Sequence, residues 1–422
     1  MEVVVEQEEA GPEEAVNQAE AGVQEVGQEA DHFCLRAEWH TSPGCDLRQV
    51  RRANPMVSRR ILWLVAAGGI SLATFGKNTP RTAPVPADPL EIVTGQIQVV
   101  DKPASREPVL QLIARARNSY ALRSASHGYD LKVTFTVNSG GQTEYDGAWS
   151  MEDIFDPQQG LRWTAETAAG YSTTRIFSHG MFYAEGTAST VPLRLQEARA
   201  ALFDAIPSAD YVDRDFIRTS TSAYKGAQVT CFLLLDPGNT ATATPARRWE
   251  ETEECIDPRT GLLQVHSQAP GRYFAYDYSN APRLGDSVLP RKVTVTEAGK
   301  IVSEITVDSL TELPAADPSL FVPTEQMQSN GPAIAMLGAQ KIWRFAGREP
   351  FPSGATVRPV CVFGLVTSSG QLVEAHSLQP TDQNSQRAVE DAQRMNFSSP
   401  TPPGARPQQH FVFFIEKFVS SR

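Results

Sequence analysis

Polar and apolar residues alternate most clearly in the segment YDLKVTFTV, residues 129–137. In an extended chain, one side of this segment would carry Tyr129, Leu131, Val133, Phe135 and Val137, and the other side only polar residues. Such alternation is typical of an antiparallel strand with one face on a core and one face in water. Just before it, the apolar residues of PVLQLIARARNSYALR recur at helical spacing. The sequence therefore predicts a helix followed by a strand at the start of a folded region.

Similar patterns continue to about residue 327. A second helix is predicted over Pro192–Ile206, and further strands are predicted up to Val307, the last two joined by the turn Glu297–Lys300. Many strands joined by short turns, with only two helices, are typical of the α+β class. We therefore predict that residues 107–327 form one β-rich domain, a curved antiparallel sheet or half-barrel with helices packed on it.

The C-terminal segment, residues 354–422, predicts a small ββαβ domain that follows a linker at residues 328–353. Its predicted elements are the strands Val357–Val366, Gln371–Leu378 and His410–Val419 and the helix Ser385–Met395. A three-stranded sheet beside one helix has open edges, to which a partner strand can add. We predict that the final strand, with Phe411, Val412, Phe413, Phe414 and Ile415, is this partner-binding edge. The alternative is that the strand forms the core of the small domain.

One long apolar run without charges, Ile61–Phe75, follows a basic cluster of Arg51, Arg52, Arg59 and Arg60. Basic residues stay on the cytoplasmic side of a membrane, so the residues after the run should be exported. The run is shorter than the roughly 20 residues of a full membrane span. We predict that residues 56–76 are a signal peptide or an inner-membrane anchor, and that residues 77–106 form a linker. Cleavage and retention both remain open.

Residues 1–55 differ in composition from the rest of the chain. They hold 12 acidic and four basic residues, a net charge of −8, which leaves −3 of the total −11 for the remainder. Such a segment buries little apolar surface and is predicted to be a disordered acidic leader. Two interpretations remain open: a short cytoplasmic tail, or an extension upstream of a true start at Met56. The exported part has no basic field, so nucleic acid is not an expected partner.

Candidate chemistry is sparse. Cys231 and Cys255 lie on predicted strands on either side of a polar insertion, and a hairpin would bring them together. Since exported proteins keep disulfides, we predict that these two cysteines are bonded, with two free buried thiols as the alternative. The chain has no HExxH, GxSxG or CxxC motif and no glycine-rich phosphate loop. We therefore expect a protein that is not an enzyme and that needs neither cofactor nor metal.

Three stretches of residues 107–327 resemble the LolA/LolB/RseB-like family of periplasmic lipid- and lipoprotein-binding domains. They are the opening helix with the strand YDLKVTFTV, the turn CIDPRTGLL at 255–263, and the closing pattern that ends in Phe321-Val-Pro323. This resemblance implies a curved sheet around helices with a concave apolar pocket for acyl chains. The candidates for lipid-facing residues are Val133, Phe135, Phe274 and Tyr276. A role of these side chains in the core is the competing interpretation. Cys255 stands where the family has Trp.

The last segment resembles the C-terminal domain of the TonB energy-transducing family. The similar residues are Phe351-Pro352, the stretch VTSSGQLV at 366–373, the pattern from Ala388 to Pro400, and the final strand FVFFI. This resemblance implies a module that binds partner proteins. The family's transducers also carry a membrane histidine and a long proline-rich spacer. Ile61–Phe75 has no histidine and Thr79–Pro89 is short, so the resemblance favours binding over energy transduction.

Two hypotheses for function follow. In the first, the chain is an envelope protein whose TonB-like module binds an envelope or outer-membrane protein by strand addition, linked to transport. In the second, it is a periplasmic carrier of lipid or lipoprotein. A filled apolar cavity under the sheet would favour the carrier, and a free strand edge would favour the partner-binding module.

Overall fold

The computed structural model of this protein describes residues 81–82, 97–100, 102–123, 127–140, 145–188, 190–235, 247–333, 340–347, 355–397 and 409–420. The predicted leader at 1–55 and the segment 56–76, with Ile61–Phe75, lie outside these residues. Among the described helices, none combines the length and the apolar character needed to cross a membrane.

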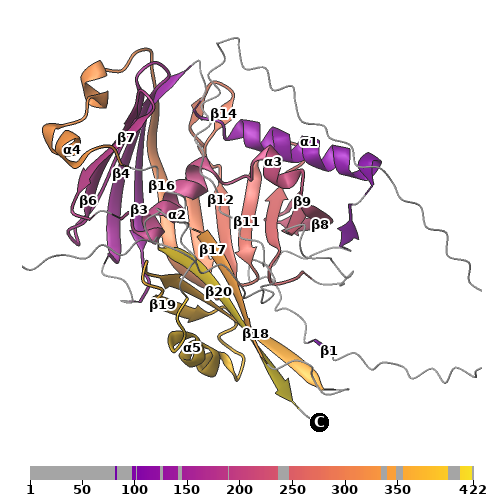
Figure 1. Ribbon diagram of the computed structural model, residues 1–422. Helices are drawn as coiled ribbons and strands as arrows, with labels where there is room; N and C mark the ends of the chain where they lie inside the picture. The colour runs from indigo at the N-terminus through magenta and orange to yellow at the C-terminus, as the bar shows by residue number, and fades with distance from the viewer. Residues whose placement is uncertain are drawn as a thin grey trace, which may run out of the picture.

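A large antiparallel sheet dominates the described chain (Figure 1). Neighbouring strands in this sheet all run antiparallel. Its two end strands, β2 and β7, do not pair with each other, so the sheet is not closed. In spatial order the strands are β2 (Gln98–Val99), β8 (Phe216–Tyr224), β9 (Ala227–Leu235), β10 (Thr252–Ile256), β11 (Leu263–Ala269), β12 (Arg272–Asp277), β15 (Lys292–Glu297), β16 (Lys300–Leu313), β3 (Gly128–Val137), β4 (Gly147–Asp156), β5 (Gly160–Thr167), β6 (Ser172–Ser178) and β7 (Met181–Gly186). The predicted α+β class with a mostly antiparallel sheet is confirmed.

The chain order explains how the sheet is assembled. Strand β16 lies in the middle, between β15 and β3, so that Leu313 pairs with Gly128. The strand β3 shows the predicted alternation: its residues from Tyr129 to Val137 are buried at every second position, while Lys132, Thr134 and Thr136 are exposed. A short separate hairpin is formed by β13 (Arg283–Leu284) and β14 (Ser287–Val288).

Helices cover one face of the large sheet, and the main hydrophobic core lies between them and the strands. They are α1 (Pro103–Ser119), α2 (Leu193–Phe203) and the short α3 (Ala209–Val212). The other face, at β4 to β6, is covered by the 3₁₀ turn η1 (Pro318–Phe321), with the short helix α4 (Glu325–Asn330) nearby (Figure 1).

A second, smaller sheet lies at one end of the large one (Figure 1). Its order is β1-β18-β20-β17, and β19 pairs with β18. The bounds are β1 (Arg81–Thr82), β17 (Gln340–Ala346), β18 (Thr356–Val366), β19 (Leu372–Ser377) and β20 (His410–Ser420), with the helix α5 (Ser385–Gln393). The helix packs Ala388 and Ala392 on one face of this sheet, over Val412 and Phe414. All three predicted strands of this segment and the helix therefore lie within a few residues of their expected positions.

The prediction that the final strand is an edge is wrong. Strand β20 pairs with β18 on one side and with β17 on the other, and Phe411, Val412, Phe413, Phe414 and Ile415 are all at most 4% exposed. The reason is β17, which runs parallel to β20 and takes up its second row of hydrogen bonds. This strand lies inside the stretch that was predicted to be a linker, so the small domain begins earlier than the sequence indicated.

Apolar side chains join the two sheets into one body. One buried cluster spans both sheets. It contains Leu193 of α2, Ala269 of β11 and Trp249, together with residues of β18 and β20 such as Phe363 and Phe413. Both faces of β20 are thus buried, one against α5 and one against the large sheet. A strand buried on both faces reads as a continuous apolar run, which accounts for the sequence HFVFFI.

Candidate functional site

The four candidate lipid-facing residues share one face of the large sheet. Register links Phe135 through Ile305 and Val293 to Tyr276, so these side chains project from the side that α1 and α2 cover. Val133, Phe135, Phe274 and Tyr276 are each 1–3% exposed and belong to the main hydrophobic core. They face the region expected for acyl chains, but in this conformation core side chains fill their surroundings.

Aromatic rings line a large part of this face. Phe135 stacks on Trp149 with ring centroids 5.3 Å apart, and Tyr171 lies 5.4 Å from Trp149. Tyr276 meets Tyr120, at the end of α1, edge to face at 6.3 Å. Such rings offer large apolar surfaces to whatever covers them.

The helix α1 is held by polar contacts as well as by apolar side chains, among them the partly buried Val109, Leu110 and Leu112. Only Ile113 and Ala116 of its residues are buried, whereas α2 buries seven. Arginine side chains of α1 donate to backbone carbonyls of neighbouring loops: Arg106 donates to Val212 at 2.7 Å and to Asp213 at 3.0 Å, and Arg117 to Pro207 at 2.9 Å. Each such hydrogen bond contributes only about 0.5–1.5 kcal/mol net. The helix α1, which packs on β10 and β14 and meets Tyr276 through Tyr120, buries fewer of its residues than α2.

A charged cluster lies where this face meets α2. The fully buried carboxylate of Asp153 accepts from Arg199 at 2.9 Å, from Arg123 at 3.3 Å and from the hydroxyl of Tyr129 at 2.8 Å. Burial raises the pKa of Tyr129, so its hydroxyl stays protonated and remains a donor. The guanidinium of Arg199 lies 4.1 Å from the ring centre of Trp163. The apolar face thus ends in two arginines that share one carboxylate.

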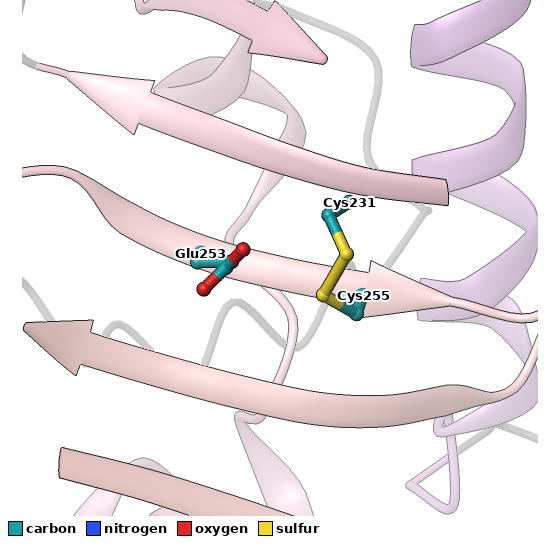
Figure 2. A group of neighbouring side chains, drawn as sticks. All are labelled: Cys231, Glu253 and Cys255. Atoms are coloured by element: carbon teal, nitrogen blue, oxygen red, sulfur yellow. A yellow bond between two sulfur atoms is a disulfide. The ribbon is translucent and has the colours of Figure 1, made fainter. Parts of the chain in front are cut away.

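The predicted pair Cys231 and Cys255 forms a disulfide on the opposite face of the large sheet (Figure 2). The two residues stand directly opposite each other on β9 and β10, with sulfur atoms 2.08 Å apart. The bond closes a loop of 24 residues, for which the chain-entropy model gives about 3 kcal/mol of stabilisation. Cys361, in contrast, is a buried free thiol.

Within the described ranges, two groups of side chains have the composition of a metal site. Cys231, Glu253 and Cys255 lie together, but the sulfurs are bonded to each other and Glu253 accepts from Arg247 at 2.6 Å (Figure 2). Glu297, Glu374 and His376 lie together at the contact between the two sheets. There Arg194 and Arg272 donate to the carboxylates, so a cation would have to displace two guanidinium groups. Neither group is a metal site in this state.

We call the second group, with its arginines, the junction cluster. Its members are Arg194 and Glu197 of α2, Arg272 of β12, Glu297 of β15, and Glu374 and His376 of β19. Arg272 donates to Glu297 at 2.9 Å, and its guanidinium lies 4.1 Å from the ring centre of Phe363 in β18. Arg194 contacts Glu297 at 2.7 Å and also Glu374. Charges from both sheets are therefore buried together.

One free edge of the smaller sheet is β17; the other long edge strand is β19, which pairs only with β18 in the described chain. No strand of the described chain pairs with the outer side of β17, and the Phe345 side chain is 53% exposed. At the large sheet, by contrast, Ala333 bridges to Phe182 on the outer side of β7. Sequence reasoning missed β17 because Lys341 and Arg344 interrupt its apolar residues, which hides the alternation expected of a strand.

Comparison with known proteins found no family model that matches the chain and no matching curated protein. Among solved structures, the chain is similar to a LolA superfamily protein from Nitrosomonas europaea, with 9% identity, 50% of this chain and 96% of that chain covered, and a TM-score of 0.31. MucB in complex with MucA(peri) matches with 13% identity, 60% and 68% coverage, and a TM-score of 0.23. LprF from Mycobacterium bovis matches with 12% identity, 50% and 97% coverage, and a TM-score of 0.21. The function proposed below rests on this chain's own residues.

Replacing Arg272 by Ala should destabilise the protein by about 3–5 kcal/mol, because it leaves the buried carboxylates Glu297 and Glu197 with too little positive charge. Urea unfolding followed by circular dichroism measures this loss. Arg259→Ala is the matched control, since that side chain is 79% exposed and should change stability by less than about 0.5 kcal/mol. A loss below about 1 kcal/mol in Arg272→Ala would contradict a coupling of the sheets through this cluster.

Stability should also fall in acid because of Glu297. Burial alone would raise the pKa of this carboxyl, but the charges of Arg194 and Arg272 outweigh burial and lower the pKa to about 2. A carboxyl whose pKa is depressed on folding stabilises the protein fully above its unfolded pKa and loses this contribution as the pH falls toward the folded pKa. The contribution, on the order of 3 kcal/mol, should therefore disappear between about pH 4.5 and pH 2.

Urea unfolding at pH 7 and pH 3 tests this dependence. Glu297→Gln should be less stable than the wild type at pH 7 and should lose less further stability at pH 3. Glu325→Gln, at an exposed carboxyl in the first turn of α4, should follow the wild type at both values. Equal losses between the two pH values in all three proteins would rule out Glu297 as the titrating group.

Proposed function

We propose that this chain is a non-enzymatic binding protein of the cell envelope that carries a lipid, or the acyl chains of a lipoprotein, beneath α1. The observation that carries this proposal is the seating of α1, a helix with two buried residues that packs on β10 and meets the aromatic side chains of the sheet at Tyr276. The LolA-like segments and the signal-like residues 56–76 support an envelope location.

Binding requires α1 to move away from the sheet. The helix would give up its arginine–carbonyl hydrogen bonds, each about 0.5–1.5 kcal/mol net, together with the burial of Ile113 and Ala116 and the partial burial of Val109, Leu110 and Leu112. An acyl chain that enters gains about 0.8 kcal/mol for each buried methylene group, so a long chain offsets this loss. Phe135, Phe274 and Tyr276 would then contact the acyl chain.

The charged cluster at Asp153 supports an amphipathic ligand. Its two arginines lie at the end of the apolar face, both donate to Asp153 and both lie near the carboxylate of Asp204, and Arg123 lies 4.3 Å from the ring centre of Phe203. A phosphate or carboxylate head group could take a place beside these arginines while the chain lies on the aromatic face.

A cross-link that holds α1 closed should abolish binding. Arg115 of α1 donates to the carbonyl of Pro258, so Arg115→Cys and Arg259→Cys place two exposed thiols near each other. Joining them with a short bis-maleimide, in a background with Cys34→Ser and Cys45→Ser, should weaken binding of a dansyl-labelled fatty acid by about tenfold or more, because the helix can no longer open. Dansyl fluorescence measures the affinity.

The same double variant treated with N-ethylmaleimide is the control, because it carries equal modification without the link. It should bind the fatty acid as the unmodified protein does. If cross-linked protein and control bind the probe equally, α1 is not the entrance. If the wild type does not bind the probe at all, the carrier proposal fails.

A second function, binding of a protein partner by strand addition, is favoured by the exposed edge of β17. Main-chain groups along this edge can pair with an extended segment, and Phe345 offers an exposed apolar contact. This is the TonB-like hypothesis with β17 in place of β20. The partner would be an envelope or outer-membrane protein.

A benzophenone-bearing amino acid in place of Phe345 should form a cross-linked adduct with one defined partner in cells, and Arg344→Pro should abolish it, because proline removes a main-chain donor and fixes φ. Gel shift and mass spectrometry of the adduct are the measurements. The same amino acid in place of Ile301, which is 52% exposed on the large sheet, is the matched control. Identical adducts from both positions, or an adduct that survives Arg344→Pro, would exclude edge pairing.

A further inference from the structure

A pocket of about 350 Å³ lies beside the start of α5, where β18 begins and β20 ends (near the mark C in Figure 1). Its wall includes Arg358, Gln383, Asn384, Arg387, Glu416 and Phe418. Register pairs Arg358 with Phe418 and Val360 with Glu416, so these side chains project from the face on which α5 packs. The pocket is therefore the part of this face that the helix leaves uncovered.

Two arginines of the pocket have few hydrogen-bond or ion-pair partners in the described chain. Arg358 forms no hydrogen bond or ion pair with any residue in the described ranges. Arg387 has one ion pair there, with Asp391 at 3.5 Å, and Asp391 also accepts from Arg394 at 2.8 Å. Guanidinium groups bind phosphate oxygens through paired, charge-assisted hydrogen bonds. The arginines thus suit a phosphate group.

Glu416 adds an acceptor to the same pocket. Its Oε2 atom is buried and has no hydrogen-bond partner in the described chain. Burial raises the pKa of this carboxyl, and the charge of Asp391 and a hydrogen bond with it raise the pKa further, while the nearby charge of Arg387 lowers it. A bound cation would relieve the effects of burial and of Asp391. The ring centre of Phe418 lies 5.6 Å from the guanidinium carbon of Arg387. This aromatic surface in the same pocket as Glu416 also favours a cation.

We propose that this pocket binds a phosphorylated amine of the phosphoethanolamine type, with the phosphate at Arg358 and Arg387 and the ammonium group at Glu416. The Asn384 side chain makes no capping hydrogen bond to α5, so its amide remains available as a further contact. The ligand is either a free phosphorylated amine or the head group of a lipid, since both carry an ammonium group two carbons away from a phosphate. This site is separate from the face under α1 and does not depend on that face binding lipid.

The test titrates the full chain with O-phosphoethanolamine, inorganic phosphate and ethanolamine up to about 10 mM, which covers millimolar affinity. Amide shifts in two-dimensional NMR report binding. Shifts should concentrate at Asn384, Arg387 and Phe418, and O-phosphoethanolamine should bind about tenfold more tightly than phosphate or ethanolamine, because only it meets both charges. Arg387→Gln should lose this binding, and Glu416→Gln should lose only the preference over phosphate.

Arg259→Gln is the matched control, because it removes an exposed arginine that also has one aspartate partner, at 3.5 Å, but lies on the other sheet. It should bind as the wild type does. No shift at the pocket, or an equal affinity for phosphate and O-phosphoethanolamine in the wild type, overturns the proposal.

Vesicle flotation distinguishes the two sources of the ligand. If the chain floats with phosphatidylethanolamine vesicles more than with phosphatidylcholine vesicles, and Arg387→Gln removes the difference, the ligand is a lipid head group. Equal flotation, together with binding of the free compound, assigns the site to a soluble phosphorylated amine.

Discussion

Two buried arginines, Arg194 and Arg272, hold the two sheets of this protein together. Each is inserted between carboxylates. Glu297 of the larger sheet contacts both arginines, and Glu374 of the smaller sheet contacts Arg194, while the Arg272 guanidinium lies over the ring of Phe363 in the smaller sheet. Removing such charges from water is costly, and only a complete set of partners offsets that cost. The relative position of the sheets is thereby fixed by charge pairing, which tolerates little displacement. The surrounding apolar contacts of Phe363 and Phe413 add stability but restrict the relative orientation of the sheets less.

The rigid junction holds α2 in place, whereas α1 lies outside the junction and buries fewer of its residues. The helix α2 contributes Arg194 and Glu197 to the junction and buries most of its residues, so it cannot move without separating the sheets. The helix α1 takes no part in the junction and rests on hydrogen bonds to loop carbonyls. A protein that binds a large apolar ligand needs one movable and one fixed wall, and the two helices divide these roles. The separate pocket beside α5 lies on the far side of the smaller sheet and shares no residue with either helix.

The sequence predicted those features that depend on neighbours along the chain. The alternation around Val133 identified β3 and its buried face, and the spacing of Val389 and Ala392 placed α5. The disulfide could be expected because the strands of Cys231 and Cys255 flank one insertion. Features that depend on distant partners were missed. The strand β17 pairs with residues about seventy positions later, and Glu297 and Arg272 appear in the sequence as ordinary polar strand residues. Periodicity also identified the face that carries Phe274 but gave no measure of the space in front of it.

The central position of β16 has a consequence for how the chain acquires its structure. This strand joins β15 to β3, so the middle of the large sheet closes only when Leu313 meets Gly128, which left the ribosome much earlier. Pairing between such distant segments is slow, and an unpaired β3 offers an apolar strand edge in the meantime. The strands β3 to β7 therefore wait, partly assembled, for the later half of the domain. The topology thus leaves an open edge on β3 during synthesis, which a chaperone could cover until β16 pairs with it.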